Sequence, residues 1–286
     1  MSVILAVNIQ GGKIVPIWIA IVLGVVQGLT EFLPVSSSGH LALMQNILDV
    51  HKYLDNALAF DIVLHLGTLV AVFVAFWADF KELVVEFFGF VKDGFKIKDR
   101  PYRRLIVMLL IATALMVPAA LLDGLVSAFM SSTLFIGCAL CVTAVMLSFA
   151  DKSGGGEKTS ADAPYRSALV VGAMQLFAVV PGISRSGSTL CGGLFSGFER
   201  EFAVKFAFLL SIPAVLGAAV FELPDMFASG FDKSLIVPCI IGFVVSAVFG
   251  YLAIKTVQLL TKKRSLRWFG LYCAVVGVVS IILSVL

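Results

Sequence analysis

Long apolar runs separated by short polar loops dominate this sequence. Six of the runs have about the 20 residues that a helix needs to cross the hydrocarbon core of a bilayer. They cover residues 57–77, 104–123, 131–150, 204–222, 234–256 and 268–286. We therefore expect six transmembrane helices in an all-α, polytopic membrane protein.

Two further apolar stretches, residues 15–48 and 167–197, are interrupted half-way by Pro, Gly and Ser. The interruptions read Phe-Leu-Pro-Val-Ser-Ser-Ser-Gly-His over residues 32–40 and Val-Val-Pro-Gly-Ile-Ser-Arg-Ser-Gly-Ser-Thr over residues 179–189. An interruption at membrane depth exposes backbone groups that lipid cannot satisfy, so it is tolerated only where it lines a protein-enclosed cavity. We predict that both stretches are re-entrant helix hairpins.

The two interrupted stretches also match each other. Residues 24–27 align with residues 172–175, since both segments begin with Gly and end with Gln. The Ser-Ser-Ser-Gly at 36–39 aligns with the Ser-Arg-Ser-Gly at 184–187. This similarity indicates an internal duplication.

The duplication divides the single membrane domain, residues 1–286, into repeat one at 15–150 and repeat two at 167–286. Each repeat holds one hairpin and three spans, so an odd number of crossings separates the hairpins. The halves must then have opposite orientations in the membrane. Such an inverted-topology repeat places a site near the bilayer midplane, where the repeats meet.

Composition and charge agree with this topology. Hydrophobic residues make up 60% of the chain and charged residues 14%, and the mean hydropathy is +1.04, whereas a soluble domain is nearer half apolar and a quarter charged. If the loop 78–103 is cytoplasmic, 17 of the 21 Lys and Arg residues lie inside and only Lys13, Lys52 and Lys233 lie outside. Cytoplasmic loops carry such an excess. The first hairpin then enters from outside and the second from the cytoplasm.

Ionisable residues at membrane depth are costly and mark functional sites. Glu31 and His40 flank the first interruption, and Arg185 lies in the second. A guanidinium suits phosphate, and a Ser beside Glu and His can act as an activated nucleophile. The N-termini of the half-helices that we expect after Gly39 and Gly187 add unpaired N–H groups and a favourable dipole for an anion. The residues that we expect to bind phosphate are Gln27, Ser36, Ser38, Gly39, Ser184, Ser186, Gly187 and Thr189.

Some of these residues have an equally good structural explanation. Ser36, Ser186 and Ser188 could simply cap or pack the half-helices. Asp61 and His65 share a helix face, and we expect them to pair with each other rather than to take part in catalysis.

Residues 27–40 and 181–189 resemble the two signature segments of the undecaprenyl-diphosphate phosphatases, the bacitracin-resistance protein family of bacteria. The resemblance covers essentially the whole chain. It implies hydrolysis of undecaprenyl diphosphate to undecaprenyl phosphate and inorganic phosphate, which recycles the lipid carrier of cell-wall synthesis and confers bacitracin resistance. It also implies a divalent cation, Mg²⁺ or Ca²⁺, and a place in the bacterial plasma (inner) membrane, with the active site open to the periplasmic face.

The resemblance further implies that Glu31, Ser37, His40 and Arg185 are catalytic and that Glu31 holds the metal. Gln27 occupies the family's first acidic position and is a weak metal ligand. We expect Ser37 to attack the terminal phosphorus while His40 and Glu31 transfer protons, with His40 as nucleophile the main variant.

Two other functions fit parts of the sequence. Inverted repeats with broken helices are typical of secondary transporters. Residues 37–40 also resemble a motif of type-2 phosphatidic acid phosphatases, but the later histidine of that family is missing, because the last His is His65. The expected partners are a polyprenyl diphosphate lipid and the bilayer, and no nucleic acid. The oligomeric state, including a homodimer, is left open by the sequence.

Overall fold

The computed structural model describes residues 15–53, 58–97, 99–122, 129, 132–228, 233–262 and 266–285. These residues form helices joined by loops, and the one β-bridge among them joins Lys158 to Phe198. Five single helices in the described part are long and apolar enough to cross a membrane. They are α5 (Pro101–Ala114, a span that continues to Ala119), α7 (Thr133–Ser153), α10 (Arg200–Ala228), α11 (Ile236–Lys262) and α12 (Leu266–Val285). The chain is an all-α polytopic membrane protein, as predicted.

The remaining predicted span, residues 57–77, differs from a simple crossing. It corresponds to α3 (Leu58–Ala75), which bends by 85° into α4 (Trp77–Lys92). The sequence 78–103, which we expected to be only a loop, therefore contains a helix. α10 begins four residues before and ends six residues after the predicted span 204–222, and α11 ends six residues after the predicted span 234–256, because the polar residues at their ends continue the helix outside the apolar window.

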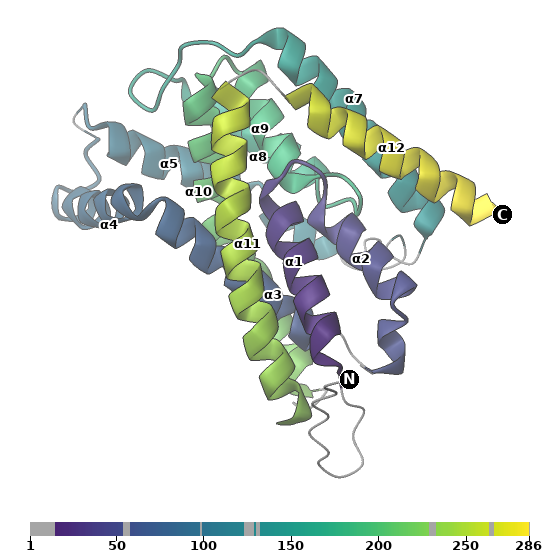
Figure 1. Ribbon diagram of the computed structural model, residues 1–286. Coiled ribbons are helices and arrows are strands. Elements are labelled where there is room, and N and C mark those ends of the chain that lie inside the picture. Colours follow the sequence, from purple (N-terminus) through teal and green to yellow (C-terminus); the bar gives the residue numbers. More distant parts are fainter. Residues whose placement is uncertain are drawn as a thin grey trace.

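Both interrupted stretches form helix hairpins. The first consists of α1 (Ile17–Phe32) and α2 (Ser37–Ile47), and the second of α8 (Tyr165–Phe177) and α9 (Arg185–Phe195). None of these helices reaches the length of about 20 residues that a full crossing requires. Figure 1 shows α1 and α2 running in opposite directions on either side of their break.

The hairpins pack in a reciprocal way. α1 lies along α11, whereas α8 lies along α5, so the first helix of each hairpin contacts the second span of the other repeat. The last spans of the two repeats, α7 and α12, lie side by side (Figure 1). An exchange of equivalent partners of this kind is expected where two related repeats face each other.

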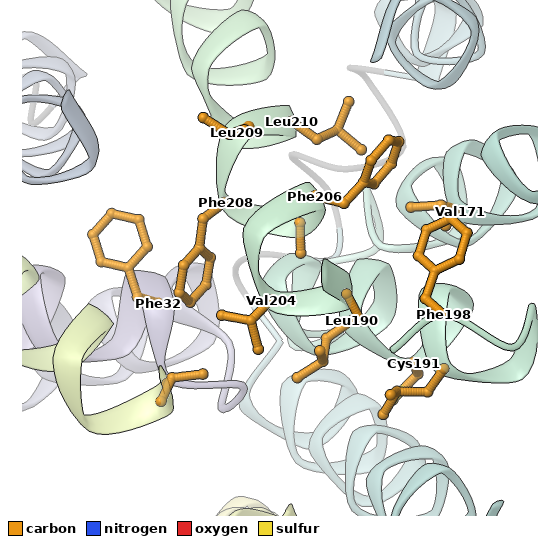
Figure 2. Packing of buried hydrophobic residues seen from close by; sticks show 14 of the residues in the cluster. Phe32, Val171, Leu190, Cys191, Phe198, Val204, Phe206, Phe208, Leu209 and Leu210 are labelled. Atoms are coloured by element: carbon orange, nitrogen blue, oxygen red, sulfur yellow. The ribbon is translucent and has the colours of Figure 1, made fainter. Parts of the chain in front are cut away.

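The main buried apolar cluster is centred on α10 and holds both hairpins. Figure 2 shows its aromatic and aliphatic side chains converging from α1, α8, α9, α10 and the loop before α10. The labelled members are Phe32, Val171, Leu190, Cys191, Phe198, Val204, Phe206, Phe208, Leu209 and Leu210. Because Phe32 ends α1 and Leu190 lies in α9, this cluster fixes the end of the first hairpin helix relative to the second hairpin.

The crossing of α7 and α12 depends on two glycines. A Cβ atom on Gly137 would lie 2.8 Å from the carbonyl oxygen of Gly277, and membrane helices use small residues to approach this closely. We expect Gly137→Ala to destabilise the protein by about 1–3 kcal/mol, measured by thermal unfolding in detergent. Gly217→Ala in α10 is the control, because its Cβ meets nothing within 4 Å, and helical Ala is more stable than Gly. Equal midpoints for the two variants would contradict the prediction.

Candidate active site

The two helix breaks meet at an ion pair. Glu31 lies near the end of α1 and is 4% exposed, and Arg185 is the first residue of α9. Nη2 of Arg185 donates a hydrogen bond to Oε1 of Glu31. A buried carboxylate is costly unless it is paired, so this contact is what makes Glu31 tolerable at that depth. The structure thus brings together the two groups that the sequence predicted to meet.

The other carboxylate oxygen of Glu31 binds polar groups from its own hairpin. Oε2 accepts hydrogen bonds from Oγ of Ser37 at 2.7 Å and from Nε2 of Gln27 at 3.0 Å. Ser37 is the first residue of α2, so its hydroxyl lies at the helix start directly beside the carboxylate. A hydroxyl in contact with a carboxylate that can take its proton is the arrangement of an activated nucleophile.

His65 also belongs to this cluster, which the sequence interpretation missed. Its Nε2 lies 3.8 Å from Oε2 of Glu31, and its Nδ1 donates to the carbonyl oxygen of Asp61 at 2.8 Å. The carboxylate of Asp61 instead accepts two hydrogen bonds from Gln45. Among the described residues, the side chains of Asp61 and His65 therefore share no hydrogen bond. The position of α3 beside α1 decides this contact, and no local pattern reports it.

His40 lies apart from the ion pair. Its Nδ1 is 2.8 Å from the carbonyl oxygen of Ser36 and therefore donates to it. In the neutral ring Nε2 is then an acceptor, and it lies 2.9 Å from the hydroxyl of Tyr272 on α12, whose ring stacks on the imidazole. In the described part of the chain, no hydrogen bond or ion pair joins His40 to Glu31 or Ser37. The expected proton-transfer pair of His40 and Glu31 is therefore not formed in this structure.

The family is decided by comparison with known proteins. Residues 20–279 match the family model described as Bacitracin resistance protein BacA. The chain belongs to this family. A protein named undecaprenyl-diphosphatase from Methanosphaera stadtmanae is 40% identical over 277 residues, which cover 93% of this chain and 97% of the relative. A protein of the same name from Alkaliphilus metalliredigens is 41% identical, with coverage of 93% and 98%.

In this BacA-family chain the half-helices begin earlier than expected. α2 and α9 start at Ser37 and Arg185, not after Gly39 and Gly187. The backbone N–H groups of these two glycines are occupied by caps, so they are not free to bind phosphate in this structure. The cap distances are 3.3 Å from N of Gly39 to Oγ of Ser36 and 3.1 Å from N of Gly187 to Oγ of Ser184.

The caps assign Ser36 and Ser184 a structural role, which leaves the first-turn amides as donors. Among the described residues, the amides of Ser37, Ser38 and Ser186 have no acceptor outside their helices. The first turn of a helix lacks intrahelical acceptors for its N–H groups, and such N–H groups bind phosphate well. Two sets of amide donors therefore flank the Glu31–Arg185 pair.

The breaks of this family member interlock. A Cβ on Gly39 would lie 3.3 Å from Cα of Gly182, and one on Gly187 would lie 3.3 Å from Cβ of Pro34. Oγ of Ser186 donates to the carbonyl oxygen of Leu33 at 3.1 Å. Ser186 is therefore a brace between the breaks. Direct backbone contact is possible because glycines face the other hairpin.

Two further hydroxyl groups support the second break. Thr189 donates within α9 to the carbonyl oxygen of Arg185 at 3.0 Å, so its hydroxyl is used inside the helix. Thr143 of α7 accepts from the backbone N of Ser184 at 3.1 Å and donates to the carbonyl oxygen of Gly182 at 3.3 Å. Thr143 was missed because a single Thr in an apolar helix carries no specific signal.

The residues present fit a metal ion only if the substrate also contributes ligands. Among the described residues, no three His, Cys, Asp or Glu side chains form a group that could hold a metal. Oε1 of Gln27 is buried and has no hydrogen-bond partner in the described part, which leaves one amide oxygen beside the Glu31 carboxylate. Mg²⁺ is commonly held by one or two carboxylates together with substrate phosphates. The site therefore suits a cation shared with a diphosphate.

Proposed function

We propose that this protein hydrolyses undecaprenyl diphosphate to undecaprenyl phosphate and inorganic phosphate, which recycles the lipid carrier for cell-wall synthesis and confers bacitracin resistance. The observation that carries the proposal is the contact of Arg185 and Ser37 with the same carboxylate, Glu31, where the two breaks meet. Membership of the BacA family and relatives named undecaprenyl-diphosphatase support it.

In the proposed reaction, Arg185 and the first-turn amides of α2 and α9 bind the phosphoryl oxygens of the substrate. Oγ of Ser37 attacks the terminal phosphorus, and Glu31 takes the hydroxyl proton across the 2.7 Å hydrogen bond. The bond from phosphorus to the bridging oxygen breaks, and undecaprenyl phosphate leaves. Water then hydrolyses the phosphoserine and releases inorganic phosphate. The in-line displacement depends mainly on positioning and on neutralising charge.

We also propose that Glu31 and Oε1 of Gln27 hold a divalent cation, Mg²⁺ or Ca²⁺, together with the diphosphate. When bound, the ion would offset negative charge on the phosphates. We further propose that the protein lies in the bacterial plasma membrane and that the site opens to the periplasmic face, which agrees with the predominance of Lys and Arg in the loops assigned to the cytoplasm.

Purified protein in detergent tests the proposed function. We expect phosphate release from undecaprenyl diphosphate without any sealed membrane. Hydrolysis takes place at one site, whereas transport requires two separate compartments. Activity that appears only in sealed vesicles would instead support a transporter. Trapping a phosphoenzyme and locating the label by mass spectrometry tests the nucleophile: label on Ser37 is expected, label on His40 would identify the main variant, and a label on neither would rule out both covalent mechanisms.

A substitution at Tyr272 tests whether the orientation of the His40 ring matters for the reaction. Tyr272→Phe removes the hydroxyl that holds Nε2 of His40. The mechanism through Ser37 and Glu31 predicts an unchanged rate of phosphate release, whereas a loss of about fivefold, the equivalent of one hydrogen bond of about 1 kcal/mol, would show that an oriented His40 takes part. Tyr251→Phe is the control, since Tyr251 lies on α11 with its ring beside Lys255. An unchanged rate for Tyr272→Phe would show that the hydroxyl does not position His40 for the reaction.

A further inference from the structure

A second polar cavity lies where the bend between α3 and α4 meets the start of α10 and the end of α11. Its volume is about 430 Å³, which is within the size range of small-molecule sites. We propose that this cavity binds a phosphate oxyanion, supplied either by the head group of an anionic phospholipid or by free inorganic phosphate. The proposal concerns binding only and does not depend on the proposed hydrolysis.

The charges that line the cavity favour an anion. Four cations and two carboxylates face it, namely Arg200, Lys205, Lys255, Lys262, Asp79 and Glu201. Lys205 pairs with Asp79 at 2.9 Å, and Lys262 pairs with Glu201 at 3.0 Å. The guanidinium of Arg200 contacts Asp151 and nearby backbone carbonyls.

Lys255 is the remaining one of the four cations that line the cavity. Within the described ranges it has no carboxylate partner, and its Nζ lies 5.4 Å from the ring centroid of Tyr251. An unpaired ammonium group on a cavity wall attracts phosphate as a point charge. The cavity therefore has both a net positive charge and a free donor.

Thr261 adds a polar residue to the cavity wall. It is among the residues that line the cavity and is 1% exposed, and its buried Oγ1 has no hydrogen-bond partner among the described residues. A buried polar group without a partner costs free energy, so this hydroxyl would be stabilised by an acceptor that enters from the cavity.

An aromatic layer separates this cavity from the candidate active site. Phe76 lines the cavity, whereas Phe32 and Phe208 line the small space of about 10 Å³ beside Glu31 and Arg185. The ring of Phe208 lies edge-on to both other rings, at centroid distances of 6.1 Å to Phe76 and 5.4 Å to Phe32. Figure 2 shows the rings of Phe32 and Phe208 side by side. The oxyanion site is therefore distinct from the catalytic one.

The basic residues that line the cavity make an anionic lipid as reasonable a source of the oxyanion as soluble phosphate. Residues such as Lys205 and Lys262 belong to the face that holds most of the Lys and Arg. Basic pockets between membrane helices on the cytoplasmic side bind anionic head groups. Inorganic phosphate presents the same oxygens without acyl chains, so separate binding measurements can distinguish the two sources.

Full-length wild-type protein serves as the parent for the test, and Arg185→Ala, which removes the guanidinium of the candidate active site, measures how much phosphate binding belongs to that site. Equilibrium dialysis with radiolabelled inorganic phosphate forms one arm. Native mass spectrometry after incubation with equal amounts of phosphatidylglycerol and phosphatidylcholine forms the other. The variants are Lys255→Gln, Glu201→Gln and, as a matched control, Lys152→Gln, an exposed cation near the end of α7 that does not line the cavity.

We expect Lys255→Gln to weaken oxyanion binding about fivefold, Glu201→Gln to strengthen it, and Lys152→Gln to leave it unchanged. An effect in the phosphate arm alone assigns the site to free phosphate. An effect in the lipid arm alone, with phosphatidylglycerol preferred, assigns it to a head group. The proposal is overturned if Lys255→Gln and Glu201→Gln match the control in both arms, or if Lys152→Gln weakens binding as much as Lys255→Gln.

Discussion

Replacing Arg185 with Ala should lower phosphate release from undecaprenyl diphosphate by about a thousandfold. Removing one preorganised donor to developing negative charge costs roughly 10²–10³ in rate, and here a full positive charge is lost as well. The change also leaves Glu31 buried without its cation. Breaking a buried ion pair costs about 3–5 kcal/mol of stability, so the variant should unfold at a lower temperature.

Arg185→Lys separates the two effects. It keeps the positive charge beside Glu31 and should recover much of the stability, but it loses the planar fork that binds two phosphate oxygens. We expect its activity to remain about a hundredfold below wild type. Arg166→Ala, at an exposed arginine near the start of α8, is the matched control and should be fully active. Wild-type rates for Arg185→Lys would show that fork geometry is not needed.

Glu31→Gln and Ser37→Ala should each reduce phosphate release by about 10²–10⁴, because the first removes the base and the second removes the hydroxyl that it activates. The two groups share one hydrogen bond of 2.7 Å. Groups that act as a unit have non-additive effects, so the double variant should be no slower than the slower single variant. Initial rates at saturating substrate measure this directly.

Ser38→Ala is the matched control for these variants. Ser38 is the neighbour of Ser37, but its hydroxyl lies 3.4 Å from Oγ of Ser36 and makes no contact with Glu31 within the described residues. It should retain activity within a few fold of wild type, because only a weak neutral hydrogen bond is lost. Full activity of Ser37→Ala, or additive losses in the double variant, would contradict the assigned roles.

The two helix breaks show how much of the local structure the sequence predicts. The Pro, Gly and Ser residues at 32–40 and 179–189 predict interruptions because they fail to continue a helix, and the structure has breaks at both places. Local sequence did not locate the helix starts correctly. Ser36 and Ser184 cap their helices, so the helices begin at Ser37 and Arg185. Whether a Ser acts as a cap depends on backbone angles, which flexible Ser-Gly sequences leave undetermined.

The contacts of the histidines could not be read from the sequence. Helical spacing places Asp61 and His65 on one face, but it does not say which neighbour that face meets. α3 turns His65 toward Glu31 and Asp61 toward Gln45. Sequence separation also does not predict the contact of His40 with Tyr272, which forms only because α2 packs near α12.

The sequence by itself determined the class of the protein, the breaks and the meeting of Glu31 with Arg185, because apolar length sets membrane depth and costly buried charges must find each other. Tertiary structure decided the bend between α3 and α4, the part played by His65, the separation of His40 from the ion pair and the second cavity. These features depend on how each helix is rotated and tilted against its neighbours. Packing sets rotation and tilt, whereas hydrophobicity along the chain does not specify them.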